Sequence, residues 1–117
     1  MAENTAVEIT DDRERGCLVA REDGTATGSI AYFAMVPAPG ALVAVHTVVP
    51  PEHEGRGIAG ALVREFYGMA AREGVPVVPL CPYVVTWAQR HPDEAPGAPE
   101  ELVREAQAQL RNHPELF

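Results

Sequence analysis

Lysine is missing from this 117-residue sequence, so all nine of its basic residues are arginines, against 17 aspartates and glutamates. The net charge of −8 leaves no basic face to neutralise a phosphate backbone, which excludes a general nucleic-acid binder. An acidic surface suits a cationic partner, but it also serves solubility alone, and charge by itself favours that simpler role.

Long apolar runs are also missing. No segment reaches the roughly 18 consecutive apolar residues that a membrane span needs, and residues 1–15 are acidic rather than basic followed by apolar. We therefore expect a cytoplasmic protein that does not enter a membrane. The sequence has only two cysteines, Cys17 and Cys81, and without an export signal we expect free thiols rather than a disulfide bridge.

The spacings that mark metal sites and serine hydrolases are absent as well. The histidines form no HxxH or HExxH motif and the cysteines no CxxC motif, so we expect no metal site. Ser29 is the only serine, and Gly28-Ser29-Ile30 is not a nucleophile elbow. With 46% hydrophobic and 22% charged residues, the composition is that of one globular domain, residues 1–117, with a core of its own.

Short apolar segments in the first half of the chain predict an antiparallel meander. The predicted strands cover residues 7–10, 17–21, 25–36 and 41–49, and the segments between them are 11–16, 22–24 and 37–40. The last two strands are apolar on both faces, which is typical of strands that are covered on both sides.

The second half predicts helices around one more strand. Residues 57–73 have one apolar stripe, and Gly74 is a natural C-terminal cap. The stripe consists of Ile58, Leu62, Phe66 and Met69. Residues 75–80 predict a strand parallel to 41–49, because a helix of this length allows a crossover connection. Two further helices are predicted at 82–90 and 100–111, so the fold class is α/β with a mixed sheet.

The most distinctive segment is Glu54-Gly55-Arg56-Gly57-Ile58-Ala59-Gly60, between a strand and a helix. Glycines let the backbone approach a ligand, and the free amides at a helix start favour an anion such as a pyrophosphate. The three glycines also spell GxGxxG, the dinucleotide fingerprint. However, the next strand does not end in the acidic residue that this fold requires, and the chain is too short for a second mononucleotide half. A tight turn without any ligand is the other alternative.

Residues 49–62 resemble motif A of the GNAT N-acetyltransferases, whose pattern V-x-P-[ED]-x-[RQ]-G-x-G-[IL]-[GA] precedes a helix. The resemblance extends to a small single-domain subgroup, the YjdJ-type acetyltransferases. This chain has its motifs in the same order: His46-Thr47, then Cys81-Pro82-Tyr83, then Arg90-His91-Pro92. The match covers roughly residues 6–92, and several separated motifs are far more specific than one glycine loop. A C-terminal helical extension, about residues 99–112, lies outside it.

The resemblance implies a GNAT-like acyl-CoA N-acyltransferase fold, in which the antiparallel meander is followed by a β-α-β crossover with splayed parallel strands. It also implies acetyl-CoA as co-substrate, with its pyrophosphate on the loop amides and its pantetheine arm between the splayed strands. The implied CoA-binding residues are Val48, Val49, Glu54, Gly55, Arg56, Gly57, Ile58, Ala59 and Gly60. Glu54 stands where the family has Arg or Gln and repels an anion. Residues 11–16 are only a turn where full family members have helices, so we expect an open acceptor side.

Acetyl transfer needs a neutral amine, a polarised carbonyl and a proton for the departing thiolate. The resemblance places His46, Cys81 and Tyr83 near the ends of the splayed strands. Cys81 is a candidate nucleophile that accepts the acetyl group, or a general acid that protonates CoA, with His46 as its base. The alternative for both residues is a buried structural role. Tyr83 is the alternative acid, whereas Trp87 and Cys17 are expected to be structural.

The sequence therefore predicts an acetyl-CoA-dependent N-acetyltransferase, an acyltransferase acting on groups other than aminoacyl, with an unidentified amine as acceptor. A non-catalytic acyl-CoA-binding or interaction module of the same fold is the alternative from another class, and a structural domain without a ligand is the third. Because the sequence shows no heptads and no obvious apolar patch, we expect a monomer or a weak homodimer.

Overall fold

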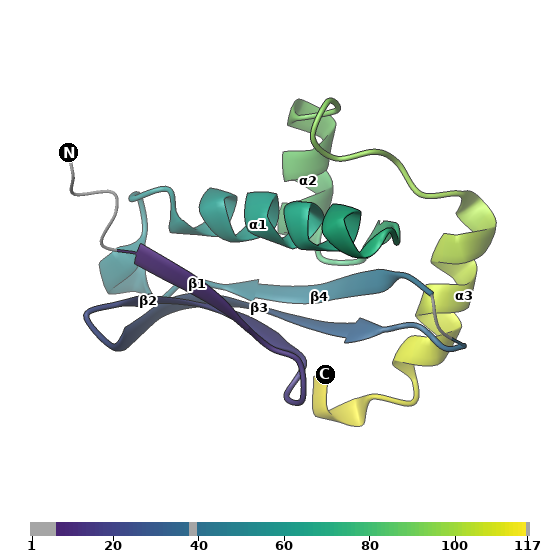
Figure 1. The fold of residues 1–117 in the computed structure, drawn as a ribbon, viewed down its shortest axis with the longest axis horizontal. Helices are drawn as coiled ribbons and strands as arrows, with labels where there is room; N and C mark the ends of the chain where they lie inside the picture. Colours follow the sequence, from purple (N-terminus) through teal and green to yellow (C-terminus); the bar gives the residue numbers. More distant parts are fainter. Residues whose placement is uncertain (1–6, 38–39, 117) are drawn as a thin grey trace.

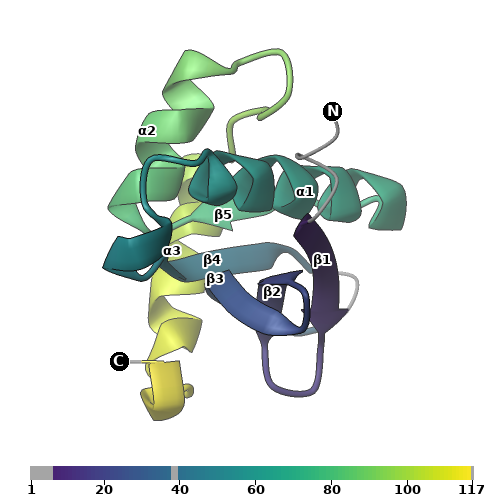
Figure 2. The same ribbon diagram turned by 90° about the vertical axis from the view of Figure 1, so that its left-hand side faces the viewer.

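The computed structural model describes residues 7–37 and 40–116. They form a five-stranded sheet in the order β1-β2-β3-β4-β5, with α1 and α2 together on one side and α3 passing beside β4 and β5 (Figures 1 and 2). The strands are β1 (Val7–Asp12), β2 (Cys17–Glu22), β3 (Thr25–Ala34), β4 (Leu42–Val48) and β5 (Val77–Pro79). The helices are α1 (Ile58–Glu73), α2 (Pro82–Arg90) and α3 (Glu100–Leu110), with short 3-10 turns at Pro51–His53 and Pro114–Leu116.

The sheet confirms the predicted mixed topology. The first four strands pair in an antiparallel meander, and β4 pairs with β5 in parallel, Leu42 opposite Val77 and Ala44 opposite Pro79. Most boundaries differ from the prediction by one or two residues. The largest differences are in three strands: β1 continues through Asp12 because it pairs with the whole of β2, β3 ends at Ala34, and β5 covers only Val77–Pro79. The predicted turn at 37–40 lies partly outside the described residues.

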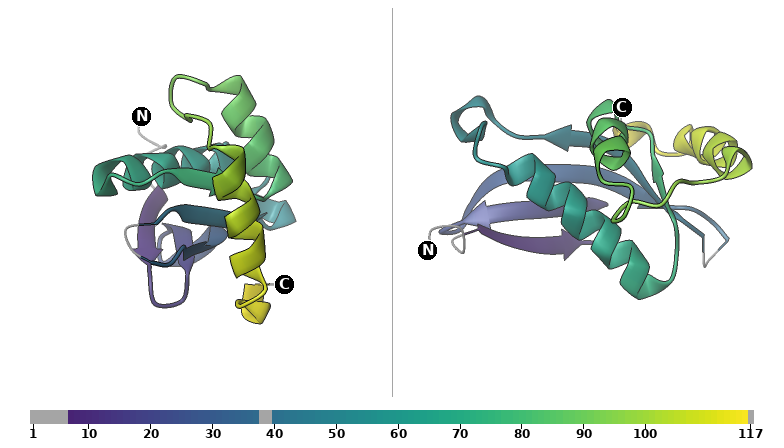
Figure 3. Two further views of the ribbon diagram at one scale, coloured as in Figure 1. Left: turned by 90° about the vertical axis from the view of Figure 1, so that its right-hand side faces the viewer. Right: turned by 90° about the horizontal axis from the view of Figure 1, so that it is seen from above.

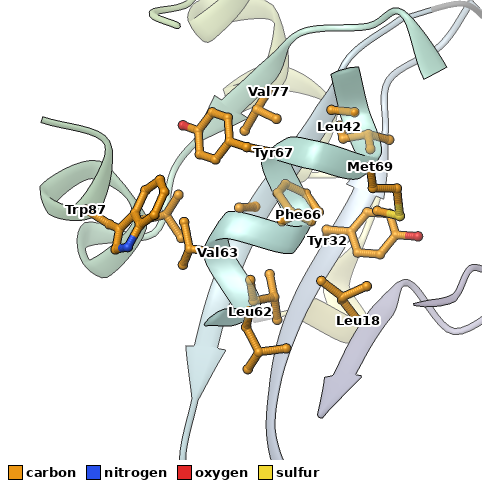
Figure 4. Packing of buried hydrophobic residues seen from close by; sticks show 14 of the residues in the cluster. Leu18, Tyr32, Leu42, Leu62, Val63, Phe66, Tyr67, Met69, Val77 and Trp87 are labelled. Atoms are coloured by element: carbon orange, nitrogen blue, oxygen red, sulfur yellow. The ribbon is translucent and has the colours of Figure 1, made fainter. Parts of the chain in front are cut away.

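The larger core cluster lies between the sheet and α1, and its centre is Phe66 (Figure 4). The ring of Phe66 packs edge-on against Tyr32 of β3, with the ring centroids 5.2 Å apart. The predicted apolar stripe of α1 is buried, and the helix ends at Gly74, which adopts φ 75° and donates to the carbonyls of Ala70 and Ala71. Seen from above, α1 runs diagonally across the sheet (Figure 3).

Gly28 of β3 allows the first turn of α1 to approach the sheet closely. A Cβ atom at this position would lie 3.0 Å from a methyl carbon of Ile58 and 3.1 Å from one of Leu62. These contacts are tighter than ordinary packing, so any larger residue would push the start of α1 away from the strands. The glycine therefore sets the position of the helix start.

A second cluster lies on the opposite face of β3 and β4 and is covered by the C-terminal segment. Phe33, Val43 and Val45 pack there against Ala106 of α3 and Leu116. The side chain of Gln109 anchors α3 to the segment that follows β3, because it accepts from the backbone N–H of Val36 at 3.0 Å and donates to the carbonyl of Val36 at 2.7 Å. Among the described residues, no helix combines the length and apolar character that crossing a membrane requires.

Candidate active site

A cavity of about 480 Å³ opens where β4 ends and α1 begins. In Figure 1 this is the left-hand end of α1, where the chain leaves β4, passes through the 3-10 turn Pro51–His53 and rises into the helix. The wall of the cavity combines the glycine-rich loop with side chains from the end of β4 and from α2. The lining residues are Thr47, Val49, His53, Glu54, Gly55, Gly57, Ile58, Ala59, Gly60 and Tyr83.

The loop presents unpaired backbone donors to this cavity. Gly55 adopts φ 82° and Gly57 adopts φ 79°, a left-handed conformation that glycine reaches without strain. Gly57 caps α1 without a side-chain hydrogen bond. Within the described part of the chain, the backbone N–H groups of residues 55–60 have no hydrogen-bond acceptor. Because most of these donors belong to residues that line the cavity, at the positive end of the helix dipole, the loop is suited to an anion.

The parallel strands separate at Ala44, which opens the sheet beside the loop. The carbonyl of Ala44 accepts from the N–H groups of both Leu80, at 2.9 Å, and Cys81, at 3.1 Å. This double hydrogen bond ends the pairing, because the chain then turns away into α2, while β4 continues to Val48. The splayed strands that the resemblance implied are therefore present, and they lead into the cavity.

A β-bulge at Val45 decides which side chains of β4 face the cavity. Ala31 of β3 pairs with His46, but the next residue, Tyr32, pairs with Ala44, so Val45 is the extra residue. Strict alternation would place His46 on the same face as Ala44 and Thr47 on the other. The bulge reverses this order, and Thr47 lines the cavity in place of His46.

His46 is thus not placed beside Cys81, and the predicted pairing of these two residues is wrong. Nε2 of His46 contacts the backbone carbonyl of Leu116, which belongs to the second core cluster on the opposite face. The histidine is not buried in the core either, since its side chain is exposed apart from this contact. The bulge is the physical reason, because it shifts the side-chain alternation by one residue.

Cys81 lies directly behind the cavity wall. Its side chain is buried, and its thiol donates a hydrogen bond to Oγ1 of Thr47 at 3.4 Å. Cys81 also caps the N-terminus of α2 in an extended conformation. Both cysteines are free thiols, as predicted. Cys17 begins β2, which is separated from β4 by β3 in the sheet, and it does not line the cavity.

Two aromatic residues of α2 complete the wall facing the start of α1. Tyr83 is 43% exposed and lines the cavity, and its hydroxyl would lie 3.9 Å from a Cβ atom on Gly60. Trp87 is buried against Tyr67, with ring centroids 6.0 Å apart, which agrees with its predicted structural role. Tyr83 is therefore available to a molecule in the cavity, whereas Trp87 supports the wall from behind.

Most of the predicted CoA-binding residues line this cavity, but Val48 and Arg56 do not. Val48 is 56% exposed on the face of β4 opposite to Thr47 and Val49. Arg56 turns back to the end of β2, where it forms an ion pair with Glu22. Sequence reasoning missed Thr47 and His53 as lining residues. Both lie within the motifs already identified, but only the bulge and the 3-10 turn direct them into the cavity.

Comparison with known proteins connects this geometry to a family. A family model described as a GCN5-related N-acetyl-transferase matches residues 17–96 of the chain. The match is at the level of this broad family, so the YjdJ-type subgroup stays a prediction. No curated protein sequence matches the chain significantly.

Solved structures with the same fold include two acetyltransferases. The ribosomal-protein-alanine N-acetyltransferase from Brucella melitensis biovar Abortus 2308 superposes with a TM-score of 0.54 and 25% identity, covering 71% of this chain and 62% of that one. The N-acetylglutamate synthase from Neisseria gonorrhoeae, complexed with coenzyme A and N-acetyl-glutamate, has a TM-score of 0.55 and 20% identity over 94% of this chain and 28% of that one. The chain thus spans less than two thirds of either relative.

Proposed function

Because the chain belongs to the GCN5-related N-acetyltransferase family, we propose that it transfers the acetyl group of acetyl-CoA to an amine of a second substrate. The observation that supports this most strongly is the cavity, where the unpaired amides of residues 55–60 meet the open edge of β4. A pyrophosphate is the anion that matches several backbone donors at a helix start.

In this proposal the pyrophosphate of acetyl-CoA accepts hydrogen bonds from the loop amides. The pantetheine arm then follows β4 past the point where β5 has turned away at Ala44. The thioester would lie beside Thr47, and Tyr83 would stand on the α2 side. The backbone thus binds and orients the co-substrate, while few side chains are needed for affinity.

The chemistry requires the amine nitrogen to attack the thioester carbonyl. The tetrahedral intermediate collapses to the amide, the C–S bond breaks, and CoA leaves as a thiolate that takes up a proton. The thiol proton of Cys81 already points at the hydroxyl of Thr47 on the cavity wall, which supports a relay in which Thr47 protonates CoA and Cys81 reprotonates Thr47. The proton that the attacking amine loses restores Cys81.

Two other assignments of the site are distinguished by experiment. If Cys81 is a nucleophile, its sulfur takes the acetyl group, CoA leaves, and the amine then removes the acetyl group from the enzyme. If Tyr83 is the acid, the phenol rather than the thiol supplies the proton to CoA. Both assignments use residues at the same cavity, so they share the CoA-binding part of the proposal.

The proposed function is tested by CoA release in a panel of amines, amino acids and peptides, with acetyl-CoA as donor and chromatographic detection of both products. We expect one class of amine to accelerate CoA release above the rate of hydrolysis. In parallel, CoA should raise the melting temperature, because a ligand at 100 times its Kd stabilises the folded state by about 2.7 kcal/mol. Stabilisation without turnover on any amine would indicate the acyl-CoA-binding module, and no stabilisation would refute the CoA site.

A further inference from the structure

His53 is a cavity-lining side chain whose hydrogen bonds are determined by a neighbouring arginine. Nη1 of Arg56 lies 3.2 Å from Nδ1 of His53. A guanidinium group has donors only and stays charged, so Nδ1 must accept and carries no proton. The ring proton of the neutral histidine is then on Nε2, the nitrogen that Arg56 does not occupy.

The arginine is held in place by a carboxylate from another part of the sheet. Nη2 of Arg56 donates to both carboxylate oxygens of Glu22, at 2.7 Å and 2.6 Å. Glu22 ends β2, and its side chain is only 22% exposed. The side chain of Arg56 is paired with Glu22 and does not line the cavity. Its guanidinium group therefore reaches a ligand in the cavity through His53.

The side chains that line the cavity carry negative charge, which is unfavourable for an anion unless a side chain also donates a hydrogen bond to it. Glu54 places a carboxylate among the lining residues, and the lining set contains neither lysine nor arginine. Among these residues of the described chain, His53 is the one whose side chain offers a nitrogen donor. An anion that enters the cavity would therefore meet one repelling side chain and one polarised N–H group on adjacent residues.

We propose that Nε2–H of His53 donates to a phosphate oxygen of the acyl-CoA, and that Arg56 and Glu22 are positioning residues that fix the required tautomer. This inference rests on the proposed function and adds a side-chain donor to the backbone cradle. Charge-assisted hydrogen bonds of this kind are shorter and stronger than neutral ones, so the donor offsets the repulsion by Glu54. The phosphate is either the pyrophosphate or the 3′-phosphate of CoA, and both offer the same acceptor chemistry.

Two isosteric variants separate this role from simple packing. Glutamine places its amide N–H near the position of Nε2, whereas asparagine reaches only as far as Nδ1. We expect His53→Asn to weaken CoA binding about tenfold or more in calorimetry, and His53→Gln to keep most of the affinity. Pantetheine, which carries no phosphate, should bind the wild type and both variants equally.

Dephospho-CoA lacks the 3′-phosphate and keeps the pyrophosphate, so it distinguishes the two groups. If His53→Asn binds dephospho-CoA about tenfold more weakly than the wild type does, His53 donates to the pyrophosphate. If the two proteins bind dephospho-CoA equally, His53 donates to the 3′-phosphate.

The positioning role has its own readout in the nitrogen chemical shifts of the His53 ring. Wild-type protein should show a proton on Nε2, and Arg56→Met should show a mixture of tautomers with weaker CoA binding. Arg56→Met should add nothing to the loss in His53→Asn, because it acts through the same ring. The proposal is overturned if His53→Asn binds CoA like the wild type, if both variants lose the same affinity, or if pantetheine binding falls equally. If the wild type binds no CoA at all, the proposed function fails as well. Failure of the His53 proposal alone is therefore recognised by wild-type CoA binding that does not depend on His53.

Discussion

The thiol of Cys81 donates to Oγ1 of Thr47, so the N-terminus of α2 and the end of β4 are joined at the cavity by a hydrogen bond of 3.4 Å. The two residues are 34 positions apart in the sequence. They meet because both Leu80 and Cys81 bind the carbonyl of Ala44 just before the chain leaves the sheet. This arrangement gives the thiol proton a direct route to the cavity wall.

Replacing Cys81 tests how the thiol acts. If it is an acid behind Thr47, Cys81→Ala should lower kcat about 10²-fold to 10⁴-fold, with unchanged affinity for CoA. If it is a nucleophile, incubation with acetyl-CoA alone should add an acetyl group to the peptide that contains Cys81, as seen by mass spectrometry. Cys17→Ala is the matched control and should keep the wild-type rate. Full turnover in Cys81→Ala would remove the catalytic role and make Tyr83 the leading acid.

The bulge at Val45 predicts opposite effects for two neighbouring residues. Thr47→Val removes the acceptor of the Cys81 thiol from the cavity wall, so we expect it to lower kcat with little change in stability. His46→Ala removes the contact with the Leu116 carbonyl, so we expect a loss of about 1 kcal/mol in the free energy of unfolding and a kcat close to wild type. Steady-state kinetics and urea denaturation of both variants check this, and a large loss of kcat in His46→Ala would contradict it.

Gly57 allows a direct test of the anion site. A Cβ atom at this position meets no other atom within 4 Å, so the cost of a substitution comes from φ 79° and from charge. Asparagine and aspartate have the same shape, and both tolerate left-handed backbone better than most residues do. We therefore expect Gly57→Asn to bind CoA moderately well and Gly57→Asp to bind it at least about tenfold more weakly. Equal affinities in calorimetry would show that no phosphate approaches this position.

Glu54 is the departure from the family pattern, and it lines the cavity. Replacing it by Arg or Gln removes a negative charge near the start of α1. A charge at a helix terminus is worth about 0.3–1 kcal/mol, so CoA should bind about twofold to fivefold more tightly, and Glu54→Arg should exceed Glu54→Gln. The gain should shrink at high salt, because exposed charges are screened. An unchanged Kd at low salt would mean that Glu54 does not face the bound phosphates.

Burial of Tyr67 predicts how stability depends on alkaline pH. Desolvation raises the pKa of Tyr67 from 10.0 to about 12, because the folded protein disfavours the phenolate (Figure 4). Below pH 10.0 the phenol is neutral in both states and its contribution to stability is complete. Between this pH and about 12 the unfolded chain loses the proton first, so stability falls, by about 2 to 3 kcal/mol.

Urea denaturation at pH 9 and pH 11 measures the first half of this fall, about 1.4 kcal/mol, because at pH 11 the unfolded tyrosine is mostly ionised whereas the folded one is not. Tyr67→Phe should reduce it, although not to zero, because burial and the hydrogen bond to Asp11 also raise the pKa of Tyr32. The same fall in wild type and Tyr67→Phe would show that Tyr67 is hydrated in the folded state.

The sequence alone predicted the elements whose signals are local. The stripe of α1 repeats within a helical turn, Gly74 ends the helix through its own conformational freedom, and the loop glycines determine where the backbone can turn toward a ligand. The parallel pairing of β4 and β5 also followed, because a strand, a helix and a second strand in this order have few ways to connect. Most of the residues predicted to bind CoA line the cavity, because they are consecutive in the loop that the glycines mark.

Tertiary structure decided which side chains meet. Whether His46 or Thr47 faces the cavity depends on the register between β3 and β4, and the bulge at Val45 shifts that register without a mark in the local pattern of apolar residues. The side chain of Arg56 does not line the cavity because it binds the carboxylate of Glu22, 34 residues earlier in the sequence. Pairings of this kind depend on the position of a distant segment in space, whereas periodicity and turn chemistry act over a few residues, and so the sequence determined the site's backbone and the fold determined its side chains.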